Sequence, residues 1–260
     1  MADSVVITRP LGQADALAQK VAAIGRDAII FPLLEIQPLA DTAALQATLA
    51  DLADCALVVF VSPNAIDAAF AQWPGRPPRW PEHIIFAVMG EGSRAALARH
   101  GVTPANAHIV SPHHPERTDS QTLLEALDLE ALKGKQALII RGETGRELLA
   151  DELRAAGVIV RQVAAYRRVA PTLDKARRAQ LLTLLASRND WIVTSSEALR
   201  ILLRMIEQIA GPDGVAKMQQ QHIVVPHARI EETAKILGFQ RITLTASGDD
   251  SLLAALQFRA

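Results

Sequence analysis

The sequence predicts an α/β protein made of two doubly wound parallel-sheet lobes of the flavodoxin-like or Rossmann-like kind. Short runs rich in Val and Ile alternate with Ala- and Leu-rich helical patterns along the chain. The runs are apolar at consecutive positions, which is typical of strands buried on both faces of a parallel sheet. The series also occurs twice, because Arg9 and Gly25 recur in the same relative positions as Arg141 and Gly157. Unless the apolar runs match by chance, two similar halves indicate two similar lobes facing a cleft.

Each expected element follows from its local pattern. Strands are expected where β-branched and other apolar residues run together, and helices where apolar residues recur at a spacing of three or four. In the first half the expected strands are 5–8, 28–31, 57–61, 84–88 and 108–110, and the expected helices are 15–24, 42–52, 65–70, 94–100 and 120–127. In the second half the expected strands are 137–140, 158–163, 191–194, 223–225 and 242–244, with helices between them.

Two segments bounded by proline, 32–38 and 164–171, interrupt this alternation and are expected to be extended. They occupy equivalent places in the two halves. As linkers they could carry the chain out of one lobe and back, so that 38–171 forms one lobe and the two ends form the other. The local pattern by itself favours a simpler arrangement, in which 1–132 and 133–260 fold separately.

Composition excludes several classes of protein. Half of the 260 residues are apolar, which is enough for the cores of two domains. No window approaches the ~20 apolar residues of a membrane span, and the first residues lack the basic region of an export signal, so a cytoplasmic protein is expected. Lys and Arg number 27 against 28 acidic residues, without a basic stripe, which disfavours nucleic acid as a partner. An acidic small ligand would have to be bound by local arginines, backbone amides and helix N-termini.

Candidate binding residues lie where a predicted strand gives way to a helix, because ligands of open parallel sheets bind beyond the carboxyl ends of the strands. These junctions are Thr8-Arg9-Pro10, Ser62-Pro63-Asn64, Gly90-Glu91-Gly92-Ser93, Arg141-Gly142 with Gly145-Arg146, Thr194-Ser195-Ser196 and His227-Ala228-Arg229. Each junction alone is explained equally by a helix cap or a tight turn. Together they would place amide N–H groups and several arginines around one cleft, which suits a ligand with several carboxylates.

Tyr166 is the only tyrosine and lies in one of the two linker segments. Its phenol either faces the cleft as a hydrogen-bond donor or packs the linker as an amphipathic anchor. A phenol with a pKa near ~10 is protonated at neutral pH, so it suits assistance to a departing hydroxide. The sequence contains no recognisable metal-ligand set or nucleophilic triad, and Gly90-Glu91-Gly92 lacks the third glycine of a dinucleotide fingerprint.

The ordered set of motifs resembles the uroporphyrinogen-III synthase family over nearly the whole chain. The motifs that carry the resemblance are Thr8-Arg9-Pro10, Val61-Ser62-Pro63-Asn64-Ala65, Asp119-Ser120, Arg141-Gly142 with Gly145-Arg146, Tyr166-Arg167-Arg168, Thr194-Ser195-Ser196, and His227-Ala228-Arg229-Ile230 with Leu237-Gly238-Phe239. Two positions depart from the family pattern. Gln121 stands where glutamate is expected, and Ser93 replaces a more usual threonine.

The resemblance implies two lobes, 1–37 with 172–260 and 38–171, joined by a two-stranded linker. It also implies that hydroxymethylbilane, a linear tetrapyrrole with eight carboxylates, binds between the lobes and closes with inversion of its last ring and loss of water. In the family mechanism, loss of the terminal hydroxyl gives an azafulvene, and a spirocyclic intermediate then fragments and recloses. No cofactor or metal is implied. We further expect a monomer that contacts the preceding pathway enzyme transiently.

Site residues are expected from the resemblance and from charge. Tyr166 matches the tyrosine thought to assist departure of the hydroxyl, and Ser62, Ser93, Ser195 and the amides beside Arg141-Gly142 match positions lining the family's cleft. Arg9, Arg146 and Arg229 are added on electrostatic grounds. Gly90, Thr194 and His227 complete the expected substrate-binding set from the junctions themselves.

Two other functions remain open at this point. The first is a bilobal binding protein that closes on an anionic metabolite without altering it, as solute receptors do. The second is a nucleotide-dependent enzyme that uses the loop at Gly90. The missing export signal counts against the first, and the incomplete glycine motif counts against the second.

Overall fold

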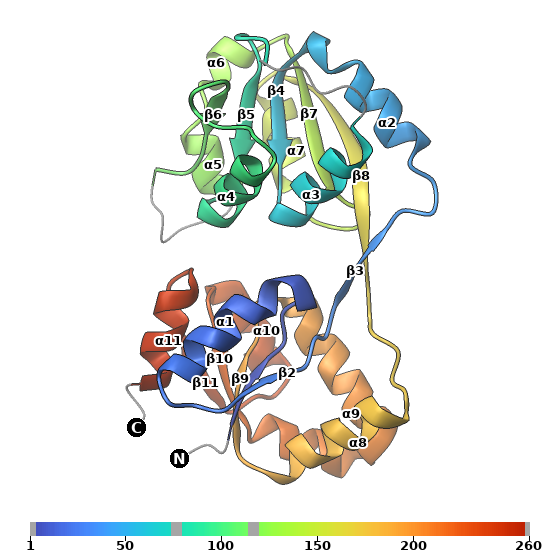
Figure 1. Cartoon of the computed structure of the whole chain (residues 1–260), viewed down its shortest axis with the longest axis vertical. Coiled ribbons are helices and arrows are strands. Elements are labelled where there is room, and N and C mark those ends of the chain that lie inside the picture. The colour runs from blue at the N-terminus through green and yellow to red at the C-terminus, as the bar shows by residue number, and fades with distance from the viewer. Residues whose placement is uncertain (1–3, 74–79, 114–119, 258–260) are drawn as a thin grey trace. The chain divides into compact units, whose positions relative to one another are not determined.

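The structure, a computed structural model, describes residues 4–73, 80–113 and 120–257. The chain forms two compact units, unit 1 with Met1–Glu35 and Val169–Ala260, and unit 2 with Ile36–Arg168 (Figure 1). The two units are therefore not the two halves of the sequence repeat. Asp119, which belongs to one of the family motifs, lies outside the described residues.

Unit 1 contains a five-stranded parallel sheet in the order β11-β10-β9-β1-β2. Its strands are β1 (Ser4–Ile7), β2 (Ala28–Ile30), β9 (Asn189–Ile192), β10 (His222–Val225) and β11 (Arg241–Leu244). Helices α1 (Leu11–Ala23) and α11 (Asp249–Gln257) pack on one face, and α8 (Lys175–Ala186), α9 (Ser196–Gln219) and α10 (Ala228–Ile236) pack on the other. Both faces are thus buried, since Val5 and Ile7 belong to one apolar cluster and Val6 to the other.

Unit 2 contains a six-stranded sheet in the order β3-β8-β7-β4-β5-β6, in which β8, β7, β4, β5 and β6 are parallel. Its strands are β3 (Glu35–Pro38), β4 (Cys55–Phe60), β5 (Ile85–Val88), β6 (His108–Val110), β7 (Gln136–Gly142) and β8 (Ile159–Val169). Helices α2 (Ala43–Ala50), α3 (Pro63–Gln72) and α4 (Glu91–Arg99) cover one face, and α5 (Ser120–Glu125), α6 (Leu129–Leu132) and α7 (Leu148–Ala155) cover the other. A short 3-10 helix, Leu52–Asp54, leads into β4.

The predicted fold class is confirmed, and the main difference from the expected elements concerns β8. The local pattern placed a strand at 158–163 and a separate extended segment at 164–171, but the structure has one strand that runs to Val169. The reason is that β8 is paired on both sides. On one side β7 continues through Arg141 and Gly142, which pair with Ala164 and Tyr166 across a shift of register, and on the other side lies β3. Tyr166 is therefore a residue of a paired strand.

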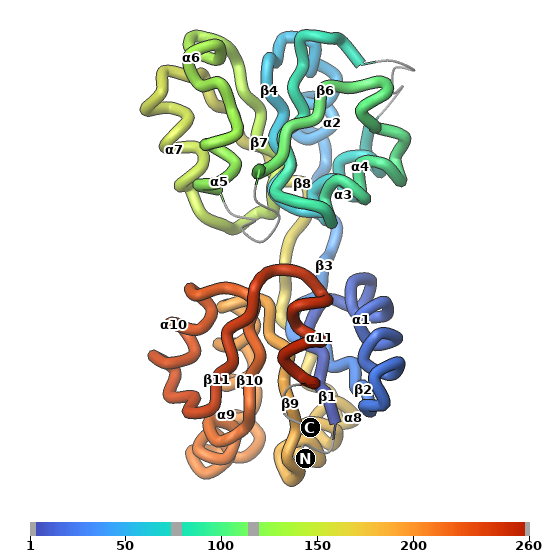
Figure 2. Tube along the Cα trace, turned by 90° about the vertical axis from the view of Figure 1, so that its left-hand side faces the viewer, coloured from blue at the N-terminus to red at the C-terminus, as the bar shows by residue number. Residues whose placement is uncertain are grey.

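Each sheet combines strands from both halves of the repeat. In chain order β1 and β2 correspond to β7 and β8, while β4, β5 and β6 correspond to β9, β10 and β11. Once this correspondence is applied, the two sheets have the same strand order. Strands from the first and second halves of the repeat meet at the β1–β9 pair in unit 1 and at the β4–β7 pair in unit 2. Figure 2 shows the first of these pairs, with β1 beside β9 although the two are far apart in the chain.

Within the described ranges, no helix combines the length and the apolarity that a membrane crossing requires. This holds even for the long α9.

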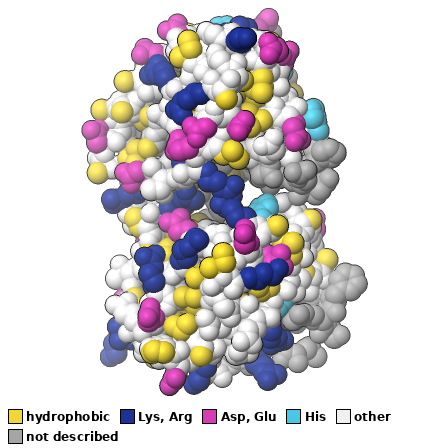
Figure 3. All heavy atoms as spheres, turned by 180° about the vertical axis from the view of Figure 1, so that it is seen from behind, with side chains coloured by type: hydrophobic (Ala, Val, Ile, Leu, Met, Phe, Trp, Pro, Cys, Tyr) yellow, Lys and Arg dark blue, Asp and Glu magenta, His cyan; other side chains and the backbone are white. Residues whose placement is uncertain are grey.

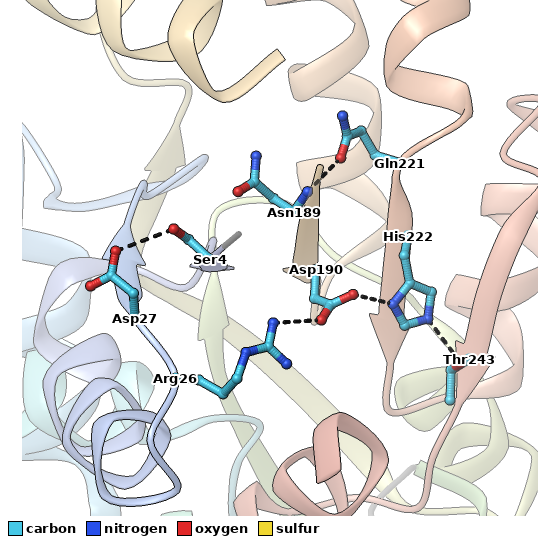
Figure 4. Close-up of polar contacts among 8 residues, drawn as sticks. All are labelled: Ser4, Arg26, Asp27, Asn189, Asp190, Gln221, His222 and Thr243. Carbon is cyan, nitrogen blue, oxygen red and sulfur yellow. Dashed lines mark hydrogen bonds and ion pairs between the residues drawn. The ribbon is translucent and has the colours of Figure 1, made fainter. Parts of the chain in front are cut away.

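A buried polar network joins three strands at the amino end of the unit 1 sheet (Figure 4). Asp190 in β9 accepts hydrogen bonds from Arg26 at 2.9 Å and from Nδ1 of His222 in β10 at 2.6 Å. Nε2 of His222 lies 2.9 Å from the hydroxyl of Thr243 in β11. Burial alone would raise the pKa of Asp190, but the hydrogen bonds from His222 and Arg26 outweigh burial and hold the pKa below its usual value.

We expect Asp190→Asn to destabilise the protein at neutral pH by about 3 kcal/mol, because the guanidinium of Arg26 loses its buried counter-ion. A carboxyl whose pKa is lowered in the folded state contributes stability above its unfolded pKa of about 3.9, and this contribution is lost as the pH falls through the folded value. The difference in unfolding free energy between wild type and variant should therefore shrink on acidification from pH 7.

Urea unfolding of both proteins over this pH range checks the prediction. Asp250→Asn is the control, because the pair of Asp250 with Lys20 is exposed and should contribute little at any pH. A difference for Asp190→Asn that stays constant with pH would contradict the assignment of the effect to the carboxylate.

Candidate functional site

The predicted binding residues of unit 2 gather at the carboxyl end of its sheet, where the strand order reverses. The chain fills the sheet outward from β4 in one direction through β5 and β6, and in the other direction through β7 and β8. Connections therefore diverge from the carboxyl ends of β4 and β7, which leaves room for a ligand beside the loops. Ser62 follows β4, and Gly142 ends β7. These two residues flank the switch point.

Tyr166 contacts both Ser62 and Gly142 at this position. The hydroxyl oxygens of Ser62 and Tyr166 are 3.1 Å apart. A Cβ placed on Gly142 would lie 3.1 Å from Cζ of Tyr166 and 3.3 Å from its hydroxyl oxygen, so the absence of a side chain at 142 lets the ring lie on the end of β7. Tyr166 is only 3% exposed, whereas Ser62 is half-buried. The structure thus brings together three of the residues that the sequence suggested.

Ser62 is also the N-cap of α3. Its backbone is extended, its Oγ accepts a hydrogen bond from the amide of Ala65 at 3.2 Å, and Pro63 occupies the first helical turn. This is the capping role that the sequence allowed for a serine before proline. Capping and contact with Tyr166 are combined in one hydroxyl.

The Gly90 loop lies beside this cluster. Gly90 precedes α4, and Ser93 is buried in its first turn. A Cβ on Gly92 would meet Cγ of Pro63 at 3.8 Å, so the starts of α3 and α4 lie next to each other. Gly90 and Ser93 therefore belong to the same end of the sheet as Ser62.

Arg141 is held by its own unit. It is 9% exposed, and its guanidinium donates to Glu147 at 2.5 Å and to Gln162 at 2.6 Å. Gln162 also donates to Glu147, and these hydrogen bonds lower the pKa of the Glu147 carboxyl. Arg146 is exposed in the loop between β7 and α7. A ligand carboxylate that bound Arg141 would compete with Glu147 and Gln162. Arg146 is exposed to solvent, where a ligand can reach it directly.

The predicted residues of unit 1 occupy the matching end of its sheet. Arg9 follows β1 and forms an ion pair with Asp249 at 2.6 Å. Thr194 and Ser195 follow β9, and Ser195 caps α9 by accepting from the amides of Glu197 and Ala198. His227 precedes α10, and Arg229 is exposed in its first turn. Arg9 and Ser195 flank the switch point between β1 and β9 just as Gly142 and Ser62 flank that of unit 2.

Sequence reasoning did not find the partners of these side chains. Asp249, Glu147 and Gln162 were not singled out, although each fixes a predicted arginine. The repeat gave one signal, because Asp250-Ser251 repeats the Asp119-Ser120 motif directly beside Asp249. Nothing comparable indicated Gln162, which reaches Arg141 from the neighbouring strand.

A hollow of about 230 Å³ opens in unit 2 beside Tyr166. Its lining residues are Ile36, Gln37, Pro38, Asn64, Asp67, Ala68 and Tyr166. The only charged group among them is Asp67, which is paired with His100 at 2.8 Å. An apolar hollow bordered by a carboxylate suits an uncharged part of a ligand and disfavours its carboxylates.

Charged side chains of both signs are mixed on the surface. In the view of Figure 3, Lys and Arg side chains lie among Asp and Glu side chains on both units. A polyacid that reaches this face would be met by individual cations within a mixed surface. Binding of several carboxylates then depends on the positions of individual Lys and Arg side chains relative to those carboxylates.

Comparison with known proteins gives a consistent result. The sequence model of a protein family described as "Uroporphyrinogen-III synthase HemD" matches residues 15–253. The uroporphyrinogen-III synthase of Escherichia coli (strain K12) is 31% identical over 260 residues, which cover 98% of this chain and 100% of that protein. The enzyme of the same name from Salmonella typhimurium (strain LT2) is 32% identical over 261 residues, with coverage of 98% and 100%.

Solved structures with the same fold carry the same name. Uroporphyrinogen-III synthetase from Helicobacter pylori 26695 aligns with a TM-score of 0.62 at 13% identity, over 98% of this chain and 99% of that one. A mutant uroporphyrinogen III synthase from the extremely thermophilic bacterium Thermus thermophilus aligns with a TM-score of 0.56 at 12% identity, over 98% of both chains. At these identities the likeness establishes the fold.

The packing of Tyr166 on Gly142 predicts the effect of a methyl group there. Gly142→Ala would force the buried ring to move by a few tenths of an ångström, and we expect the unfolding free energy to fall by about 1 to 3 kcal/mol. Denaturant unfolding measures the change. Gly12→Ala in α1 is the matched control, because a Cβ there meets nothing within 4 Å and alanine favours a helix. Equal stability of Gly142→Ala and wild type would mean that the ring does not depend on the bare strand end.

Proposed function

Because the chain belongs to the uroporphyrinogen-III synthase family, we propose that it cyclises hydroxymethylbilane to uroporphyrinogen III, with inversion of the last pyrrole ring and loss of water. The family consists of enzymes of tetrapyrrole biosynthesis, and the bilobal binding protein is set aside on that ground. The observation within the structure that carries the proposal best is the Tyr166 phenol bonded to Ser62 at the switch point of unit 2. The phenol is a proton donor at the start of α3, and departure of a hydroxyl requires such a donor.

The reaction asks the protein mainly to hold one conformation. Free hydroxymethylbilane loses water and closes unaided, without inversion, so selectivity requires that its ends be held for the spiro route. Many anchoring contacts and few reacting groups meet this demand. The residues we propose for binding the substrate are Arg9, Ser62, Gly90, Ser93, Arg141, Gly142, Arg146, Thr194, Ser195, His227 and Arg229. Tyr166 is the proposed source of the proton, and the proposed steps use no cofactor or metal.

The two paired arginines refine this proposal. Arg9 and Arg141 already bind Asp249 and Glu147, so a substrate carboxylate would have to replace or join those carboxylates. Exchange costs less at an exposed partner than at a buried one, because the released carboxylate regains water. Glu147 is the more exposed of the two partners, at 54% against 25% for Asp249. Arg141 is therefore the better placed of the pair to exchange.

The test of the function is the identity of the product. The purified chain, supplied with freshly made hydroxymethylbilane and followed by oxidation and chromatography, is expected to give type III porphyrin. We propose that it acts as a cytoplasmic monomer, so the preceding pathway enzyme, which it contacts only transiently, need not be present. Type I porphyrin alone would refute the proposed function.

Replacement of the phenol tests the role of Tyr166. General acid catalysis is worth about a hundredfold or more, but the substrate also loses water unaided, so we expect Tyr166→Phe to lower kcat by about tenfold. KM and the fold should change little, since only a hydroxyl is removed. Steady-state kinetics with product analysis measures both constants. An unchanged kcat would remove Tyr166 from the mechanism.

A further inference from the structure

We propose that Ser62 passes the proton of Tyr166 to the departing hydroxyl, so that the serine, and not the phenol, touches the substrate. This inference rests on the proposed function and assigns the route of its proton. It starts from exposure: Tyr166 is 3% exposed, while Ser62 is half-buried at the start of α3. The hollow that Tyr166 lines is apolar, whereas the phenolic hydroxyl lies against Ser62 and the end of β7. The proton of this hydroxyl therefore reaches a polar group of a ligand most directly through Ser62.

The direction of the hydrogen bond follows from counting donors and acceptors. A serine hydroxyl has one proton to donate and two lone pairs that accept. Ser62 Oγ accepts from the amide of Ala65. If it also accepts from Tyr166, both lone pairs are used and the serine proton is left for a third partner.

The opposite direction leaves the buried phenol poorly satisfied. If Ser62 donated to Tyr166, the phenolic proton would need another acceptor, and within the described residues Ser62 is the hydrogen-bond partner of that hydroxyl. A buried donor without an acceptor is costly. The arrangement in which Tyr166 donates to Ser62 satisfies the buried phenol and leaves the proton of the half-buried serine for a further acceptor.

The proposed step balances. The bond between the terminal carbon and its hydroxyl breaks, the Ser62 proton joins that oxygen to form water, and the Tyr166 proton moves to Ser62 Oγ. The pyrrole ring loses its N–H proton as it becomes the azafulvene, and this proton returns along the same route to the phenolate. Serine and tyrosine are restored, and the substrate has lost one water. The start of α3 favours the negative charge that develops on this route.

The sequence repeat supplies an internal comparison. Ser195 is the counterpart of Ser62 and caps α9, but its Oγ accepts from two backbone amides, those of Glu197 and Ala198. The chain has no second tyrosine to place beside it. A cap needs only the amides, so capping accounts for both hydrogen bonds of the Ser195 hydroxyl. It leaves the phenol at Ser62 to be explained by another role.

The test separates the hydroxyl from the cap. Ser62→Gly removes the hydroxyl at little cost to helix capping, and Ser62→Thr restores both. We expect Ser62→Gly to lower kcat about tenfold with KM nearly unchanged, and Ser62→Thr to recover most of the loss. Asp174→Ala is the control for capping, because Asp174 caps α8 through the amide of Arg177 away from the proposed machinery. It should lower the melting temperature and leave kcat unchanged.

A double variant and a solvent isotope measurement complete the test. Tyr166→Phe with Ser62→Gly should be no slower than the slower single variant, because both interrupt one route. For the wild type, the rate should depend quadratically on the deuterium content of the solvent, since two protons move together. Three results would each overturn the relay. They are a double variant whose loss of kcat is the product of the two single losses, a Ser62→Gly variant with the kcat of the wild type, and a rate that depends linearly or not at all on the deuterium content. Production of type III porphyrin by the wild type would still uphold the proposed function in those cases.

Discussion

The pairing of β4 with β7 is the contact on which unit 2 depends. It joins a strand from the first half of the repeat to one from the second, and β1 with β9 does the same in unit 1. At each of these pairs the connections turn away in opposite directions, which opens the carboxyl end of the sheet. The backbone amides and caps found there, at Ser62 and Ser195 above all, are consequences of strand order. A repeat folded half by half would place Ser62 and Gly142 in different sheets.

The register of β7 and β8 then determines the chemistry. A shift of one residue between Arg141 and Gly142 sets Tyr166 opposite a residue without a side chain. A Cβ at 142 would lie 3.1 to 3.3 Å from the ring and hydroxyl of Tyr166, so any larger residue would force the ring to shift. This shift of register in the β7–β8 pair thus brings the Tyr166 phenol against both Gly142 and the helix cap Ser62. Arg9 and Arg141 are fixed differently, through the carboxylates of Asp249 and Glu147 in their own units, which keep them oriented before any ligand binds.

The sequence predicted what is local and left open what is not. Strands such as 57–61 and 137–140 follow from consecutive apolar residues, and Ser62 before Pro63 was readable as a cap. The extent of β8 was not, because Arg167 and Arg168 interrupt the apolar run and the end of the strand depends on its neighbours β7 and β3. The local pattern also favoured separate halves, since either way of combining the strands buries the same apolar runs. The pairs of Ser62 with Tyr166 and of Arg9 with Asp249 join residues distant in sequence, and their contacts depend on strand order.

Stability and function are placed at opposite ends of the same strands in unit 1. Asp190 and His222 lie near the amino ends of β9 and β10, where the Asp190 carboxylate accepts hydrogen bonds from Arg26 and His222. Ser195 and His227 lie beyond the carboxyl ends of the same two strands, where α9 and α10 begin and where we propose that the substrate binds. A buried network contributes to holding strand register only if every group is satisfied, whereas a binding edge must keep groups available. Separation of the two ends lets the binding edge keep its amides and arginines while the sheet is held at the other.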